Sequence, residues 1–181
     1  PSQLKEKIKH FVSRKAMNAD GLGERWLEQL LEKGLIKHSA DLYDLTAEKI
    51  LAANIEGMGE KLADNIITAI TNTKHTTLQR FIYALGIRGV GEGPSLGLAQ
   101  YFGTLEAIKS ADEEALKQVP DIGEVSAKWI VAYFSQEIHL KQLEQFLAAG
   151  ITWPIIDIEQ AQHQPLVGQS WVLTGTLSSM G

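Results

Sequence analysis

One short pattern recurs at a nearly fixed interval along the chain, and it constrains the fold more than any other feature. It occurs as Ala19-Asp-Gly-Leu-Gly23, Ile55-Glu-Gly-Met-Gly59, Ile87-Arg-Gly-Val-Gly91 and Val119-Pro-Asp-Ile-Gly123. The final glycines are spaced by 36, 32 and 32 residues. A regular period of this length is typical of a repeated supersecondary unit.

The residues that follow each copy share fixed offsets. Four positions after the final glycine lie Leu27, Ala63, Ser95 and Ala127, and seven positions after it lie Leu30, Ile66, Leu98 and Ile130. These offsets share one face of an α-helix. Because glycine allows positive φ or close backbone approach, each copy predicts two helices joined by a tight hairpin. The hairpins are expected near 19–30, 55–66, 87–98 and 119–130.

The copies differ in detail. The first has Leu27 where a small residue is expected and Ala19 where a larger one would pack better. The fourth has Asp121 in place of the first glycine, and Asp tolerates the left-handed conformation better than most residues. The third continues with Gly93, Pro94 and Gly97, so its second helix is expected to be either loosened or tightly packed there.

The rest of the chain also predicts helices up to about residue 149. Leu4, Ile8 and Phe11 begin a helical apolar stripe. Thr46 and Asp112 are expected to cap helix starts, and Gly34 and Gly150 to follow helix ends. Strand-like patterns are missing before residue 171. The sequence therefore predicts an all-α domain.

Composition sets limits on function. Among 181 residues there is no cysteine, so the chain can form neither disulfides nor thiolate metal sites. The five histidines lack metal-ligand spacing, and no apolar run approaches the length of a membrane span. A cytoplasmic protein is expected. The net charge of −5 argues mildly against nucleic acid, but residues 1–15 carry five cations against one acid.

The repeated pattern resembles the helix-hairpin-helix motif. In that family, backbone N–H groups of the hairpin and of the following helix grip a nucleic-acid phosphate, which requires no strongly basic protein. Gly-x-Gly before a helix is also common as a simple connector, but four copies in register favour the motif. The predicted DNA-binding residues are the turn glycines and nearby cations: Gly21, Gly23, Gly57, Gly59, Gly89, Gly91, Gly123, Arg25, Lys61, Arg88 and Lys128.

An acidic residue follows each hairpin directly. These residues are Glu24, Glu60, Glu92 and Glu124. An acid in the first turn of a helix stabilises the helix dipole by about 0.3–1 kcal/mol at an exposed site. The same carboxylate would repel a phosphate brought to those N–H groups. We expect these glutamates to act mainly as helix stabilisers.

Longer phrases carry a second resemblance. "HFVSRKAM", "RFIYALGIR" and "YFGTLEAI" are similar to stretches of the bacterial NAD-dependent DNA ligases. The resemblance implies a domain of four helix-hairpin-helix motifs over residues 1–150, a linker over 151–167 and the start of a BRCT domain over 168–181. It also implies that a four-cysteine zinc module precedes Pro1 and that the BRCT domain continues beyond Gly181 in the full-length protein.

The resemblance implies a non-catalytic module that binds the backbone of nicked double-stranded DNA, acts with other domains of the ligase, and is monomeric. The Lys-x-Asp-Gly motif that holds the family's nucleophile does not occur in this sequence. NAD, a divalent metal such as Mg²⁺ and a structural zinc are therefore expected only outside these residues, with no cofactor bound here. Two alternatives are a helical protein-interaction scaffold and a glycosylase, for which no catalytic Lys or Asp is identified.

Overall fold

The structure is a computed structural model that describes residues 2–154, and the regular elements within that range are all helical. The all-α prediction is confirmed for this part of the chain. The predicted BRCT strand and residues 155–167 of the predicted linker lie outside the described residues. The elements are α1 (Ser2–Val12), α2 (Glu24–Glu32), the 3₁₀-helix η1 (Ser39–Asp44), α3 (Ala47–Ala52), α4 (Glu60–Asn72), α5 (Leu78–Ala84), α6 (Glu92–Phe102), α7 (Leu105–Ser110), α8 (Glu113–Lys117), α9 (Glu124–Ser135) and α10 (Glu137–Ala148).

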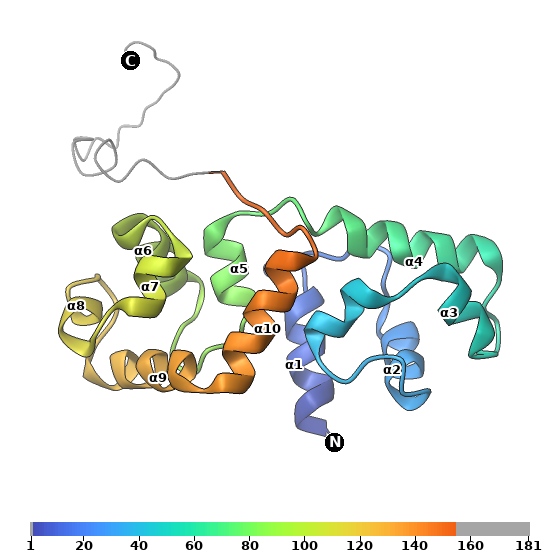
Figure 1. Cartoon of the computed structure of the whole chain (residues 1–181), viewed down its shortest axis with the longest axis horizontal. Helices are drawn as coiled ribbons and strands as arrows, with labels where there is room; N and C mark the ends of the chain where they lie inside the picture. The colour runs from blue at the N-terminus through green and yellow to red at the C-terminus, as the bar shows by residue number, and fades with distance from the viewer. Residues whose placement is uncertain (1, 155–181) are drawn as a thin grey trace, which may run out of the picture.

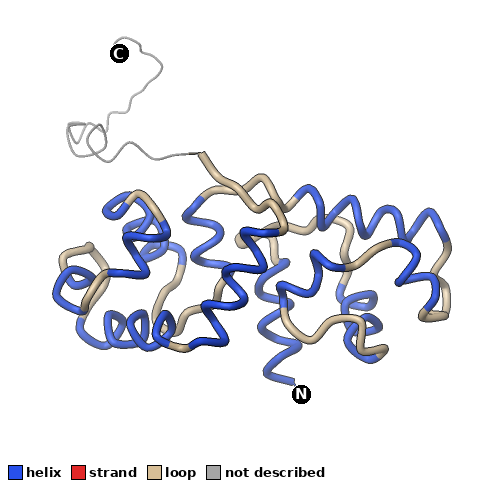
Figure 2. Tube along the Cα trace, viewed as in Figure 1, coloured by secondary structure: helices blue, strands red, loops and turns tan. Residues whose placement is uncertain are grey.

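The helices form an elongated body with α10 at its centre (Figure 1). Helices α1 to α4 lie on one side of α10 in this view, and α6 to α9 lie on the other. Figure 2 shows that short loops join successive helices. Helix α10 contacts both α9 and η1, and α5 contacts both α6 and α1. Helices α5 and α10 therefore join the two sides into one packed unit.

An aromatic cluster holds this central junction together. Phe146 of α10 stacks on Phe11 of α1 at 5.1 Å between ring centroids, and it meets Phe81 of α5 edge-on at 5.6 Å. The ring of Tyr43 in η1 lies in a T-shaped arrangement with both Phe11 and Phe146. Such pairs contribute about 0.5–1.5 kcal/mol each beyond their buried area. The cluster thus fixes the first helix against the last.

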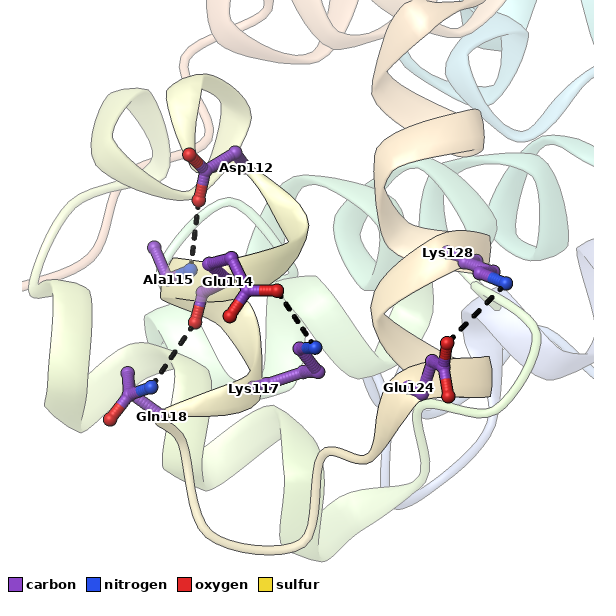
Figure 3. Close-up of polar contacts among 7 residues, drawn as sticks. All are labelled: Asp112, Glu114, Ala115, Lys117, Gln118, Glu124 and Lys128. Carbon is purple, nitrogen blue, oxygen red and sulfur yellow. Dashed lines mark hydrogen bonds and ion pairs between the residues drawn. The ribbon is translucent and has the colours of Figure 1, made fainter.

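Side-chain caps define several helix starts as predicted. The Thr46 hydroxyl accepts from the Lys49 N–H, and the Asp112 carboxylate accepts from the Ala115 N–H. Figure 3 shows the Asp112 cap at the start of α8. Gly34 and Gly150 follow α2 and α10 with φ of +72° and +102°. These predicted boundaries are confirmed.

The packed body extends to Trp153. Ile151 is buried, and the Thr152 N–H donates to the Lys74 carbonyl at 2.8 Å. The Trp153 ring stacks on Phe81 with centroids 5.0 Å apart. Residues 151–153, which the sequence places at the start of a linker, therefore pack against the helices.

Candidate nucleic-acid interface

All four repeated segments adopt the same turn. Its third residue has positive φ in every copy, and the N–H of the fourth residue donates to the carbonyl of the first at 3.0–3.1 Å. This geometry matches a type II turn, which favours glycine at the positive-φ position. The positive φ angles are +108° at Gly21, +82° at Gly57, +81° at Gly89 and +74° at Asp121. Asp121 takes the left-handed conformation, as predicted.

The predicted inward-facing positions are all buried. Every residue four or seven positions after the final glycine is at most 1% exposed. Leu27 and Ala19 are both buried, so the first copy accommodates a large residue where a small one was expected and a small residue where a larger one was expected. The apolar residue between the third residue and the final glycine of each turn is buried in three copies, as Leu22, Val90 and Ile122. In the second copy this residue is Met58, which is half-buried. The repeat therefore fixes how each helix packs.

The final glycine of each turn is the N-cap of a helix that has no side-chain cap. Gly23, Gly59, Gly91 and Gly123 precede α2, α4, α6 and α9, and all four have extended backbone angles. A Cβ placed on any of them would meet no atom within 4 Å. Neither backbone strain nor internal crowding therefore requires glycine at these positions. The four helix N-termini open onto free space, with their first N–H groups uncapped.

The turns are arranged in two neighbouring pairs. A Cβ on Gly57 would lie 3.4 Å from Cη2 of Trp26, so the second turn lies against the helix that follows the first. Ser126 of α9 donates its hydroxyl to the Gly89 carbonyl at 3.2 Å, which joins the third and fourth turns. An ion pair of 3.1 Å between Lys15 and Glu92 links the two pairs.

The third and fourth turns pack closely at Gly97, where the sequence left open whether the helix is loosened or tightly packed. A Cβ there would approach Cγ1 of Val119 to 2.8 Å and the Pro120 carbonyl oxygen to 3.3 Å. Helix α6 therefore lies directly against the first two residues of the fourth turn. Pro94 is tolerated because it occupies the first turn of α6. Glycine at position 97 therefore allows α6 to pack tightly against the fourth turn, and the helix is not loosened there.

The predicted cations lie on the surface near the turns. Arg25, Lys61 and Arg88 are exposed, and none forms an ion pair with a carboxylate within residues 2–154. Lys128 differs because its ammonium lies 3.7 Å from the Glu124 carboxylate (Figure 3). Three of the four cations are thus available to an external anion.

Arg25 and Arg88 each lie over the ring of a tryptophan, and the sequence did not predict these two contacts. The Arg25 guanidinium lies 4.7 Å from the ring centroid of Trp26, and the Arg88 guanidinium lies 4.5 Å from that of Trp129. Such cation–π contacts contribute about 0.5–1 kcal/mol at exposed sites. The tryptophans occupy different offsets in their repeats, so periodicity carried no signal for them.

Most of the glutamates that follow the turns are neutralised by lysines. Glu24 pairs with Lys9, and the hydrogen bond and charge of Lys9 hold the pKa of Glu24 below its usual value. Glu92 pairs with Lys15, and Glu124 with Lys128. Glu60 has no ion-pair partner in the described part of the chain. Negative charge at the helix starts is therefore largely offset.

No group of three or more His, Asp or Glu side chains within residues 2–154 is arranged to hold a metal ion. No helix among the described residues is both long and apolar enough to cross a membrane. The repeated turns, with their uncapped helix starts and unpaired cations, are the strongest candidate site.

Comparison with known families agrees with this geometry. The family described as "SAM-like Helix-hairpin-helix tandem" matches residues 13–72, and the family described as "Helix-hairpin-helix motif" matches residues 80–143. Each match spans one of the two turn pairs. The fold and the site therefore define a helix-hairpin-helix protein.

The similarity extends to whole-chain relatives. The sequence is 51% identical to a DNA ligase of Acinetobacter baylyi, 50% to one of Marinobacter nauticus and 48% to one of Cellvibrio japonicus. Each alignment covers 99% of this chain but 26% of the ligase. Over almost its whole length the chain is thus similar to one segment of bacterial DNA ligases, and it spans about a quarter of its relatives' length.

Proposed function

We propose that this segment binds the sugar-phosphate backbone of nicked double-stranded DNA, independently of base sequence. The observation that carries the proposal is the set of four glycine N-caps, at which a Cβ would meet nothing within the protein. Glycine there leaves room for close approach by an external group. Phosphate suits that place because a helix N-terminus offers uncapped N–H donors and roughly half a positive charge.

In this proposal all four turns are helix-hairpin-helix motifs of one domain. Gly21, Gly57 and Gly89 shape the first three turns, and Gly23, Gly59 and Gly91 admit the phosphate. Arg25, Lys61 and Arg88 lie close enough to add favourable charge. The fourth turn has the same backbone form, with Gly123 and Lys128, but Asp121 gives it a different electrostatic surface. Phosphate contacts of this kind position a protein without reading sequence.

The relatives support a proposal for the role of the segment in a longer protein. We infer that it positions an NAD-dependent DNA ligase on its substrate, while other domains of the same protein carry out the reaction. The NAD, the Mg²⁺ and the structural zinc would bind in those domains. In this proposal residues 2–154 contribute hydrogen-bond donors and a surface shaped for the duplex.

A protein-interaction scaffold is the second candidate function. The exposed apolar side chains of Val125 and Trp129, one turn apart on α9, favour it because such patches occur at protein interfaces. Salt dependence separates the candidates. Phosphate binding releases counterions, so the logarithm of the affinity falls linearly with the logarithm of the salt concentration.

The test is binding of this chain to nicked and intact duplexes of several sequences, measured by fluorescence anisotropy across a salt series. The proposal predicts a steep salt slope and similar affinities for different sequences. A matched charge-neutralised variant, Arg25→Gln with Lys61→Gln, should lower the slope by about 1.8, because each phosphate contact contributes about 0.9. Negligible binding at low salt would contradict the proposal for this segment.

A further inference from the structure

The fourth turn contains a side chain that the fold does not require. Asp121 occupies the left-handed position that glycine fills in the other three turns. A non-glycine residue in that conformation is strained. Within residues 2–154 the Asp121 carboxylate forms no ion pair, and it accepts no hydrogen bond. No contact of the carboxylate within this range therefore compensates the backbone strain at Asp121.

The carboxylate lies beside the start of another helix. A Cβ built on Gly93, in the first turn of α6, would lie 3.6 Å from Oδ2 of Asp121. Helix α6 follows the third turn, and Ser126 ties that turn to α9. The exposed carboxylate of Asp121 in the fourth turn thus also lies beside the helix start that follows the third turn.

The other charges of the pair do not offset Asp121. At the second position after the final glycine, the first two turns have Arg25 and Lys61, whereas the last two have Gly93 and Val125. Lys117 and Lys128, the lysines nearest the fourth turn in sequence, pair with Glu114 and Glu124 (Figure 3). Arg88 is the unpaired cation that remains at these two turns within the described range.

We propose that Asp121 lowers the affinity of the third and fourth turns for nucleic-acid phosphate, which makes the first and second turns the tighter half of the interface. The proposal rests on the proposed function of the segment. Repulsion acts on a phosphate at α6 and at α9 alike, because Asp121 stands between the two helix starts. The half spanning residues 80–143 then holds the duplex weakly while the half spanning 13–72 anchors it.

The decisive variant is Asp121→Asn, which removes the charge and keeps a residue that tolerates positive φ. Anisotropy with a nicked duplex should show an affinity about two- to five-fold higher, as expected for removal of one exposed charge about 5–10 Å from a phosphate when the two charges are screened as in bulk water. Glu106→Gln, which removes an exposed charge on α7, is the matched control and should change the affinity less. Both variants require a thermal denaturation curve like that of the parent chain.

Glycine substitutions measure the asymmetry independently. Gly59→Ala should reduce the affinity more than Gly123→Ala does, and Asp121→Asn should narrow the difference. Equal losses from Gly59→Ala and Gly123→Ala, or an Asp121→Asn affinity no higher than that of Glu106→Gln, would overturn the role of Asp121 while the parent chain still binds DNA. Absence of binding by both the parent chain and Asp121→Asn would contradict the proposed function as well.

Discussion

Replacing the N-cap glycines of the second and third turns with alanine should separate folding from binding. Gly59 has φ of −117° and Gly91 has φ of −86°, both open to alanine, and the added methyl group would meet no atom within 4 Å. Alanine caps a helix less well than glycine, but it also restricts the unfolded chain. We expect these opposing effects to leave the free energy of unfolding within about 0.5 kcal/mol per site.

Binding should respond much more strongly. A methyl group at either N-cap occupies the space through which a phosphate oxygen reaches the N–H groups. A hydrogen bond to a charged group contributes about 1.5–3 kcal/mol. Loss of one such bond at each turn therefore predicts an affinity about 10- to 150-fold lower for each single variant. Fluorescence anisotropy with a nicked duplex measures this loss, and thermal denaturation verifies the fold.

One control variant should give the opposite pattern. Thr104→Ala removes the N-cap hydrogen bond of α7, so it should lose about 0.5–2 kcal/mol of stability and keep its DNA affinity. Gly57→Ala differs from both because it places alanine at φ of +82°, which costs about 1–2 kcal/mol and disturbs the turn itself, so both stability and DNA affinity should fall. If Gly59→Ala and Gly91→Ala stay folded and bind DNA as tightly as the parent chain, these helix starts are not phosphate sites.

Three further predictions concern the fold. Ser95 is fully buried and its hydroxyl has no partner, so Ser95→Ala should raise the free energy of unfolding by about 1–3 kcal/mol, seen as a higher Tm. Gly97→Ala should lower it by about 1–3 kcal/mol in urea titrations, because the new methyl would meet Val119 at 2.8 Å. Burial raises the pKa of Tyr43 to about 12. Its contribution to stability is therefore complete below about pH 10 and should disappear as pH rises toward 12. In Tyr43→Phe, Tm should fall less steeply between about pH 10 and 12 than in the parent chain. The same pH dependence of Tm in both proteins would contradict this role of Tyr43.

The sequence predicted the turns well because each depends on local chemistry. Glycine or Asp at the third position, an apolar fourth residue and inward-facing residues at two fixed offsets specify one conformation wherever they occur together. The left-handed geometry of Asp121 followed from the same argument. The helix starts at Thr46 and Asp112 were predictable for the same reason, since a cap is a contact between near neighbours.

Features that depend on tertiary contacts were not predictable. The pairing of turns through Gly89 and Ser126 joins residues 37 positions apart. Two of the three lysines that neutralise the turn glutamates also come from other segments, in the pairs of Lys9 with Glu24 and of Lys15 with Glu92. Gly97 was ambiguous for this reason: propensity argues against it in a helix, and only the approach of Val119 explains it. The free space beyond the N-cap glycines likewise required the structure.

In the proposed complex, DNA phosphates bind the backbone N–H groups at the turns. A ¹H–¹⁵N NMR titration with nicked duplex would measure this binding at each N–H separately, through the amide chemical shifts. The largest shifts are expected at residues 21–25, 57–61 and 89–93, with smaller shifts at 121–125. Shifts confined to α10 or to the exposed face of α9, with the turn amides unchanged, would contradict the proposed binding.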